Sequence, residues 1–207
     1  MAYAQFGDDE HIISLFPSGH KGYAADVGAA DGRTRSNTWL MEQLGWECVC
    51  VEANPLYTEM LKLNRKNVWM VACGSEDGVG EFTAFELQPG LWEACSALKV
   101  NQQAYAAHKH MIQREYKFKV PIWTLDSILA RTEFPHLDFL SIDVEGGEED
   151  VLKGFDIAKW KPDVIELENW IETDTRCRDI LTPHGYEFDR RMGVNDIYLA
   201  TNRRVAA

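Results

Sequence analysis

Short apolar, β-rich segments alternate with helical patterns along the chain, and this alternation restricts the fold more than any other feature of the sequence. Seven such segments are present, at residues 23–27, 47–52, 68–73, 139–143, 164–168, 186–188 and 196–200. Parallel strands joined by crossover helices produce this pattern. The sequence therefore predicts an α/β fold, a doubly wound Rossmann-like sheet that is mostly parallel. Only residues 190–195 separate the last two segments, a gap of hairpin length, so we expect an antiparallel final strand pair.

The length of the chain favours a single domain. At about 150 residues per domain, 207 residues predict one compact unit over residues 1–207. Residues 1–20 are expected to contain a lead-in helix. The alternation breaks at residues 74–121, where we expect a strand at 81–86 and a helix at 102–113. We interpret this segment as an insertion that packs over the sheet as a lid.

The charge of the chain argues against several classes of partner. Its 21 Lys and Arg against 33 Asp and Glu give a net charge of −12, and so acidic a surface repels nucleic-acid backbones and anionic lipid headgroups. No apolar run approaches the roughly 20 residues of a membrane span, and the first residues lack the features of a secretory signal. We expect a cytoplasmic protein that binds neither nucleic acid nor membrane.

The cysteines are expected to pack in the core. Their number is odd and no two of them form a CxxC pair, so the sequence indicates neither a disulfide framework nor a zinc site. The five residues are Cys48, Cys50, Cys73, Cys95 and Cys177.

The loop after the first expected strand has the form of a nucleotide-binding loop, with Asp26, Gly28, Asp31 and Gly32 between a strand and a helix. A dinucleotide site needs a second glycine close to the pyrophosphate, but position 30 is Ala30, and Asp31 would place a negative charge beside that anion. S-adenosylmethionine carries a sulfonium and an ammonium group instead, and Asp26 could attract them. The loop therefore favours a cationic cofactor.

The second expected strand ends in Glu52, which lies 20 residues after Gly32. An acid in this place can accept hydrogen bonds from both hydroxyls of a ribose. The alternatives are that Asp26 caps a helix or turn and that Glu52 is a solvated strand end.

A third group of carboxylates follows the fourth and fifth expected main strands. Asp143 ends one strand, Glu145 follows before the glycine pair 146–147, and Glu168 closes the next strand. Ligands of such sheets bind at the carboxyl ends of the strands, so these three side chains are expected in one crevice. The acids at 148–150 suit the first turn of a helix and are expected to be structural.

Together these segments resemble the FkbM family of S-adenosylmethionine-dependent methyltransferases, a class I methyltransferase family, from about residue 23 to residue 200. The segment at 139–146 is the most specific to the family. The resemblance rests on Gly28-Ala29 after Asp26, residues 32–38 with Ser36-Asn37-Thr38, Val51-Glu-Ala-Asn-Pro55, Trp123-Thr-Leu-Asp-Ser-Ile128 and Phe139-Leu-Ser-Ile-Asp-Val-Glu-Gly146.

The resemblance implies a seven-stranded sheet of order 3-2-1-4-5-7-6 and the cofactor S-adenosylmethionine, with S-adenosylhomocysteine as its product. It also implies O-methylation of a hydroxyl on a small-molecule acceptor, a sugar or a natural product. Strands 1 and 4 are then neighbours at the topological switch point, so Asp26 and Asp143 would flank one crevice. The expected cofactor-binding residues are Asp26, Gly28, Ala29, Gly32, Glu52, Ala53 and Asp143.

Methyl transfer to an alcohol requires a group that takes the hydroxyl proton, and Asp143, Glu145 and Glu168 are the candidate catalytic residues. No residue is assigned as a metal ligand, but the same three carboxylates could instead hold a hard cation such as Mg²⁺. Glu145 could also merely satisfy backbone donors of the glycine turn. His108 or His110 could act as the base if the insertion forms a lid.

Two other classes of function share part of these features. An NAD(P)-dependent oxidoreductase on a Rossmann-like fold would share the first two motifs, although Ala30 and Asp31 argue against it. A non-catalytic S-adenosylmethionine-binding module would keep Asp26 and Glu52 without needing acids at the fourth and fifth strand ends.

Overall fold

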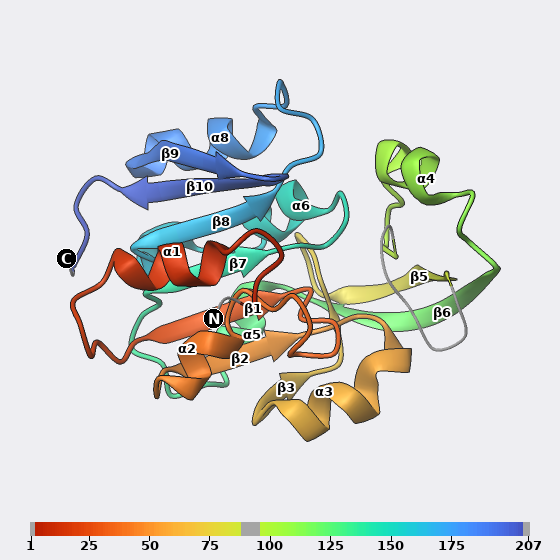
Figure 1. Ribbon diagram of the computed structural model, residues 1–207, viewed down its shortest axis with the longest axis horizontal. Helices are drawn as coiled ribbons and strands as arrows, with labels where there is room; N and C mark the ends of the chain where they lie inside the picture. The colour runs from red at the N-terminus through yellow and green to blue at the C-terminus, as the bar shows by residue number, and fades with distance from the viewer. Residues whose placement is uncertain (1–2, 88–95, 205–207) are drawn as a thin grey trace.

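A seven-stranded sheet forms the centre of the computed structural model, which describes residues 3–87 and 96–204 (Figure 1). Strands β1, β2, β3, β7 and β8 are mutually parallel, and β10 is antiparallel to both β8 and β9. Across the sheet the strands are β3 (Asn67–Trp69), β2 (Glu47–Val51), β1 (Tyr23–Val27), β7 (Phe139–Ile142), β8 (Val164–Glu168), β10 (Asn195–Ala200) and β9 (Tyr186–Met192).

The strand labels differ from the expected order 3-2-1-4-5-7-6 because three strands of a second sheet lie between β3 and β7 in the chain. With all strands counted, the order is 3-2-1-7-8-10-9. Counted within this sheet alone, the same strands follow the order 3-2-1-4-5-7-6. The last two strands pair in antiparallel fashion, as their short connection predicts.

Helices cover both faces of the sheet, because alternate residues of each buried strand point to opposite faces. On one face Ile12 and Met41 pack in one apolar cluster with Ala24 and Cys48, and Leu61 packs in a second cluster with Cys50. The helices of this face are α1 (Asp8–Ser14), α2 (Trp39–Gln43) and α3 (Thr58–Asn64). The other face is covered by α5 (Leu125–Leu129), α6 (Glu148–Lys153), α7 (Ile157–Trp160) and α8 (Arg176–Leu181), which pack on the largest cluster.

The segment at 68–73, expected to be one strand, is divided between two sheets. Its first part belongs to β3, whereas β4 (Ala72–Cys73) begins a second, three-stranded sheet of order β4-β6-β5. Trp69 of β3 and Trp123 of β6 meet at the junction, with ring centroids 5.4 Å apart. The apolar character of the segment is common to both strands, so it does not indicate where the chain changes sheet.

The insertion contains more strand than expected. In place of one strand at 81–86, β5 (Gly78–Glu86) pairs with β6 (Arg114–Trp123) in a long antiparallel ribbon, and the helix α4 (Gln102–His108) ends well before residue 113. Alternate β6 residues, among them Phe118 and Val120, pack against Phe82 and Ala84 of β5. Figure 1 shows this ribbon and α4 extending to one side of the main sheet.

The described cysteines are unpaired, as expected. Cys48, Cys50 and Cys73 are buried, and burial raises the pKa of each thiol. Cys95 lies outside the described residues. None of the helices within 3–87 and 96–204 combines the length and apolar character needed to cross a membrane.

A buried carboxyl group anchors the N-terminal helix to the sheet. Asn195 Nδ2 donates hydrogen bonds to Asp8 Oδ2 at 3.1 Å and to Glu166 Oε1 at 2.9 Å. Burial, together with the neighbouring charge of Asp9, raises the pKa of Asp8 from 3.8 to about 6. The ionised form is therefore disfavoured in the folded protein.

This shift predicts a loss of stability with rising pH. The pKa of Asp8 is higher in the folded than in the unfolded protein, so protonated Asp8 stabilises the fold. This contribution to the free energy of unfolding is fully present below pH 4 and is lost as pH rises through 6. Replacing Asp8 with asparagine should remove a penalty on the order of 2 kcal/mol at pH 8. Urea unfolding of both proteins between pH 4.5 and 8 measures the difference, with Glu59→Gln on α3 as the surface control. Parallel stability curves for wild type and Asp8→Asn would contradict this assignment.

Candidate active site

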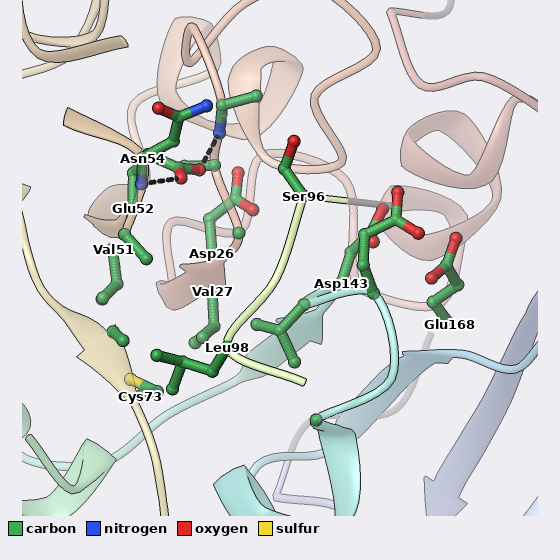
Figure 2. A pocket seen from close by; sticks show the side chains of 18 of the residues that line it. Asp26, Val27, Val51, Glu52, Asn54, Cys73, Ser96, Leu98, Asp143 and Glu168 are labelled. Atoms are coloured by element: carbon green, nitrogen blue, oxygen red, sulfur yellow. Dashed lines mark hydrogen bonds between the residues drawn. The ribbon is translucent and has the colours of Figure 1, made fainter. Parts of the chain in front are cut away.

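A cavity of about 970 Å³ lies at the carboxyl ends of the central strands. Its walls come from the loops after β1, β2, β7 and β8 and, on the other side, from the second sheet and residues 96–99 of the insertion. Figure 2 shows Glu52 and Asn54 on one side of the cavity and Asp143 and Glu168 on the other. The structure therefore brings the carboxylates expected at separate strand ends into one cavity.

Gly28 is required by the close approach of two loops. Its N–H and that of Ala29 both donate to the carbonyl of Val51, at 2.9 and 3.0 Å. Its φ is +95°, and a Cβ at this position would lie 1.7 Å from the carbonyl oxygen of Asp143. Gly28 and Ala29 both line the cavity, so the glycine fixes the distance between the β1 and β7 loops.

Gly32 does not line the cavity, in contrast to its expected place among the cofactor-binding residues. A Cβ there would lie 2.5 Å from the side chain of Arg65 and 2.6 Å from that of Leu61. Gly32 thus permits close packing against the end of α3 and makes no wall of the site.

Asp26 combines a structural role with a place in the cavity wall. Its side chain is buried, and Oδ2 accepts hydrogen bonds from Thr38 Oγ1 at 2.6 Å and Ser36 Oγ at 3.2 Å. Arg65 Nη1 lies 3.9 Å from the same oxygen. Ser36 in turn accepts the N–H groups of Thr38 and Trp39 at the start of α2. Asp26 therefore supports the start of the helix, as the alternative interpretation expected, but it does so through Oδ2 alone.

Glu52 is a buried site residue and not a solvated strand end. Its Oε2 accepts the N–H of Ala30 at 2.8 Å, and its Oε1 accepts the N–H of Asn54 at 2.6 Å (Figure 2). Burial raises its pKa from 4.5 to about 7, although these hydrogen bonds oppose the rise. Ala53 lines the cavity beside it. The backbone thus fixes a carboxylate whose oxygens retain acceptor capacity.

Asn54 is a site residue that the sequence reasoning missed. It is almost fully buried and lines the cavity, and its Nδ2 has no hydrogen-bond partner among the described residues. Its Oδ1 accepts the N–H of Leu56 at the start of a 3₁₀ turn, η1 (Pro55–Tyr57). A buried donor without a partner is costly, so this group fits recognition of a ligand acceptor. In the sequence, the position of Asn54 two residues after Glu52 was the feature that could have indicated a site residue.

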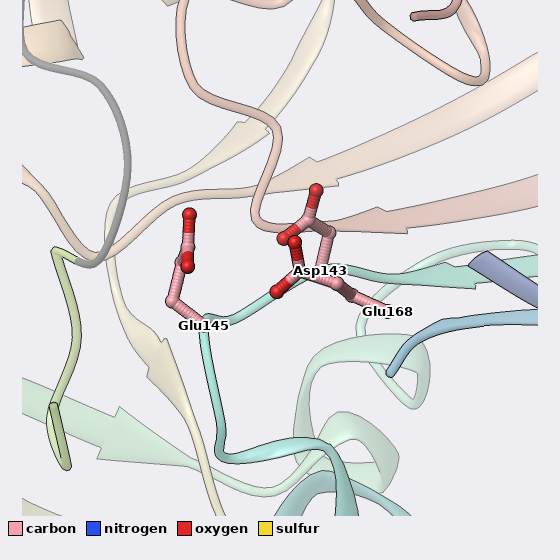
Figure 3. A group of neighbouring side chains, drawn as sticks. All are labelled: Asp143, Glu145 and Glu168. Atoms are coloured by element: carbon pink, nitrogen blue, oxygen red, sulfur yellow. The ribbon is translucent and has the colours of Figure 1, made fainter. Parts of the chain in front are cut away.

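Three carboxylates converge on the opposite side of the cavity. One oxygen from each of Asp143, Glu145 and Glu168 lies within 4.8 Å of the others. Figure 3 shows Asp143 and Glu168 close together, with Glu145 alongside. We call this group the carboxylate cluster. The expectation that these side chains meet at one edge is confirmed.

The glycine turn beside the cluster is held by Glu148. Glu148 Oε1 accepts the N–H of Val144 at 3.2 Å and that of Gly146 at 2.9 Å. Glu145 itself has a left-handed φ of +59°, which is uncommon for a residue with a side chain. These two donors of the turn therefore belong to Glu148, and the unusual backbone of Glu145 projects its carboxylate from the turn.

The electrostatics of the cluster disfavour negative charge. Burial raises the pKa of both Asp143 and Glu168 well above the usual range, and the surrounding carboxylates add to the rise. Glu168 is 9% exposed, and its Oε2 has no hydrogen-bond partner among the described residues. Such groups can accept a proton or bind a cation.

The insertion contributes His108 to the cavity. Trp170, in the loop after β8, faces this histidine. Both line the cavity, and their rings meet edge to face with centroids 5.8 Å apart. His108 Nδ1 lies 2.9 Å from the carbonyl oxygen of Ala104. A carbonyl only accepts, so Nδ1 carries the hydrogen and, in the neutral ring, Nε2 is an acceptor. His110 does not line the cavity.

A doubly wound sheet with an acid-lined cavity at its carboxyl edge defines an α/β protein that binds its ligand at the strand ends. Residues 26–188 match the family model described as Methyltransferase FkbM domain. Because this match covers more than half of the sequence, the chain belongs to the FkbM methyltransferase family. No curated protein matches the sequence.

The FkbM methyltransferase of Methylobacillus flagellatus KT is similar in structure, with a TM-score of 0.53 at 15% identity, over 86% of this chain and 43% of that protein. The chain thus spans less than half the length of that relative. A precorrin-6y C5,15-methyltransferase from Geobacter metallireducens GS-15 has a TM-score of 0.48 at 16% identity, over 94% of this chain and 87% of that chain. A TehB-like SAM-dependent methyltransferase from Corynebacterium glutamicum has a TM-score of 0.47 at 12% identity, over 95% of this chain and 89% of that chain.

Proposed function

We propose that this chain is an S-adenosylmethionine-dependent O-methyltransferase that acts on a hydroxyl of a small molecule, a sugar or a natural product. The observation that carries the proposal is the division of one cavity between a backbone-held carboxylate, Glu52, and a separate carboxylate cluster. The first arrangement suits a ribose and the second suits an acceptor hydroxyl and its proton.

The residues on the Glu52 side fit the proposed cofactor, which supplies a methyl group on a positively charged sulfur. Glu52 would accept hydrogen bonds from the ribose hydroxyls, and the unpartnered Nδ2 of Asn54 would donate to a ring or hydroxyl acceptor. Asp26 and Asp143 would stabilise the positive charge. Apolar side chains of the second sheet, including Ala72 and Phe82, line the same cavity and would cover the adenine.

The residues on the opposite side would bind and deprotonate the acceptor. The acceptor oxygen would form a bond to the methyl carbon as the carbon–sulfur bond breaks. The electrons of the broken carbon–sulfur bond would stay on the sulfur. One of Asp143, Glu145 and Glu168 would take the hydroxyl proton as this bond forms. Trp170 would form an apolar wall for the acceptor. Holding the groups in line contributes more to such a displacement than the chemistry of any one side chain.

The loop after β1 offers little to a dinucleotide. Asp31 Oδ1 accepts the N–H groups of Arg33 and Thr34, both at 2.7 Å. A pyrophosphate needs free backbone donors at such a loop, and these two are already bonded to a carboxylate. This observation supports a cationic cofactor over NAD(P). A non-catalytic binding module would not need the carboxylate cluster.

The acceptor is proposed to be neutral or cationic, since the cavity holds many acids and the chain carries a net charge of −12. The same charge supports a small-molecule partner rather than a nucleic acid or membrane surface, and we propose a cytoplasmic location. Efficient methylation of a sugar phosphate would contradict the proposed acceptor class.

Calorimetry with S-adenosylmethionine, S-adenosylhomocysteine and NAD tests the cofactor. We expect the first two to bind, and Glu52→Gln to weaken their binding about 10- to 100-fold through loss of charge-assisted hydrogen bonds. Glu59→Gln on the surface of α3 is the matched control and should bind like wild type. Release of S-adenosylhomocysteine with a panel of hydroxylated acceptors then tests catalysis. Binding of NAD without binding of S-adenosylmethionine would overturn the proposal.

The pH dependence of cofactor binding provides a further test of Glu52. Because the pKa of Glu52 is about 7 in the free protein and the ribose hydroxyls would donate to its ionised form, affinity should fall as pH drops below 7. The Kd is expected to rise about tenfold per pH unit there. Glu52→Gln should lose this dependence. An unchanged Kd for wild type between pH 5.5 and 8 would exclude the proposed contact.

A further inference from the structure

We propose that the carboxylate cluster of Asp143, Glu145 and Glu168 is a binding site for one hard divalent cation, Mg²⁺ or Mn²⁺. Its role in catalysis rests on the proposed function, but cation binding itself does not. The site would sit on the acceptor side of the cavity, away from Glu52 and Asn54 (Figure 2).

The spacing of the oxygens fits a single ion. One oxygen from each of the three side chains lies within 4.8 Å of the others. Oxygens bound to one ion at about 2.0 to 2.6 Å lie roughly 3 to 5 Å from one another. The three groups come from two strand ends, β7 and β8, whose separation is fixed by the parallel pairing of these strands. A small adjustment of side chains would therefore complete the ligand set.

Glu168 gives an independent indication of a missing partner. It is 9% exposed and extends toward Asp143 (Figure 3), yet its Oε2 is buried without a hydrogen-bond partner among the described residues. Leaving a buried carboxylate oxygen unpaired is costly. A cation bound between the carboxylates would provide the partner.

The other buried carboxylates of the cavity do not share this feature. Asp26 lies beside Arg65 and accepts two hydroxyl hydrogen bonds, and Glu52 accepts two backbone N–H groups. By contrast, within the described part of the chain no Lys, Arg or His forms an ion pair with Asp143 or Glu168. The fold thus supplies backbone or hydroxyl donors for the carboxylates on the cofactor side, whereas at Glu168 the side chain of Trp170 is the donor and Oε2 is left without a partner among the described residues.

A cation at this site would act on the acceptor hydroxyl. Three protein oxygens leave coordination positions of an octahedral ion for water and for the acceptor oxygen. The ion would lower the pKa of the hydroxyl. Each carboxylate gives one oxygen to the ion, so the second oxygen of one of them remains to take the proton. The methyl carbon then bonds to the acceptor oxygen, and the carbon–sulfur bond electrons stay on sulfur.

Titration calorimetry of the full chain with MgCl₂ and MnCl₂, after removal of metal with a chelator and without cofactor or acceptor, tests the site. We expect one ion per chain, and Glu168→Gln should weaken binding roughly tenfold or more by removing a charged ligand. Glu149→Gln is the control, because Glu149 makes surface ion pairs with Lys153 and Arg176. Asp143→Asn serves as a second ligand variant if Glu168→Gln fails to fold.

The outcomes separate this proposal from the proposed function. Absence of saturable binding, or equal binding by wild type and both ligand variants, would overturn the cation site. Full methyl transfer in excess chelator would overturn its catalytic role, while leaving the methyltransferase proposal intact. Failure to bind S-adenosylmethionine would overturn the proposed function, whereas one-to-one cation binding would still support the site.

Discussion

Asp143→Asn is expected to lower kcat by about 10²- to 10⁴-fold, the usual effect of removing a group that takes up the substrate proton. The carboxylate of Asp143 lines the cavity at the end of β7 and, within the described residues, makes no hydrogen bond or ion pair of its own. It is therefore available to the ligand. Asparagine preserves the shape of the side chain, so the fold should persist. The measurement is release of S-adenosylhomocysteine at saturating cofactor, with an acceptor found in the panel.

Three further variants make this result specific. Glu145→Gln and Glu168→Gln test the other members of the cluster, and Glu149→Gln on α6 should keep a near-normal kcat because Glu149 does not line the cavity. The affinity of Asp143→Asn for the cofactor should stay within about tenfold of wild type, since Glu52 is unchanged. Near-normal turnover in all three cluster variants would exclude a carboxylate as the base. Calorimetry with metal then distinguishes a base from a cation ligand.

Gly28→Ala should destabilise the protein by about 3 kcal/mol or more, because two effects act at one position. A φ of +95° is strained for alanine, and its Cβ would lie 1.7 Å from the carbonyl oxygen of Asp143. That oxygen belongs to the backbone, so relief requires the β1 and β7 loops to move apart. The change should therefore weaken both folding and cofactor binding. Chemical unfolding and calorimetry measure the two effects.

Gly78→Ala is the matched control for this substitution. Gly78 begins β5, and a Cβ there would have no neighbour within 4 Å. Its free energy of unfolding should stay within about 0.5 kcal/mol of wild type. If Gly28→Ala were as stable as Gly78→Ala, the close approach of the two loops would be wrong.

Sequence reasoning located the central strands because parallel strands buried on both faces are continuous apolar runs with polar ends. Val164–Glu168 is an example, with every residue buried up to its terminal carboxylate. The acids that meet in the cavity were predictable for the same reason. Asp143 and Glu168 end neighbouring strands, and the carboxyl ends of parallel strands share one edge.

The second sheet was harder to predict because its strands show mixed signals. Residues 116–122 alternate between apolar and polar side chains, as half-buried strands do, but Pro121 and the surrounding charges resemble a loop. In the structure Pro121 lies opposite Val79 within the long β5–β6 ribbon. Contacts across the ribbon, which join residues far apart in sequence, stabilise it.

Individual contacts in the site depend on distances that no local pattern contains. Gly32 belongs to the expected loop, yet its nearest potential contacts are the side chains of Leu61 on α3 and of Arg65 directly after this helix, more than 25 residues later in the chain. Trp170 and His108 meet only because α4 lies over the loop after β8. Asn54 lies two residues after Glu52 in the sequence, but only the burial of its amide, whose Nδ2 has no partner among the described residues, marks it as a site residue.

The tryptophan pair at the junction of the two sheets should give a circular dichroism signal that depends on how the two sheets are oriented. Among the described residues, Trp69 and Trp123 are the only two indole rings in mutual contact. Transitions of two indoles this close couple as an exciton, whose circular dichroism depends on the angle between the rings. Both sheets form walls of one cavity. The ultraviolet spectrum should therefore report any rotation of the second sheet against the first when a ligand enters, without a label or a mutation.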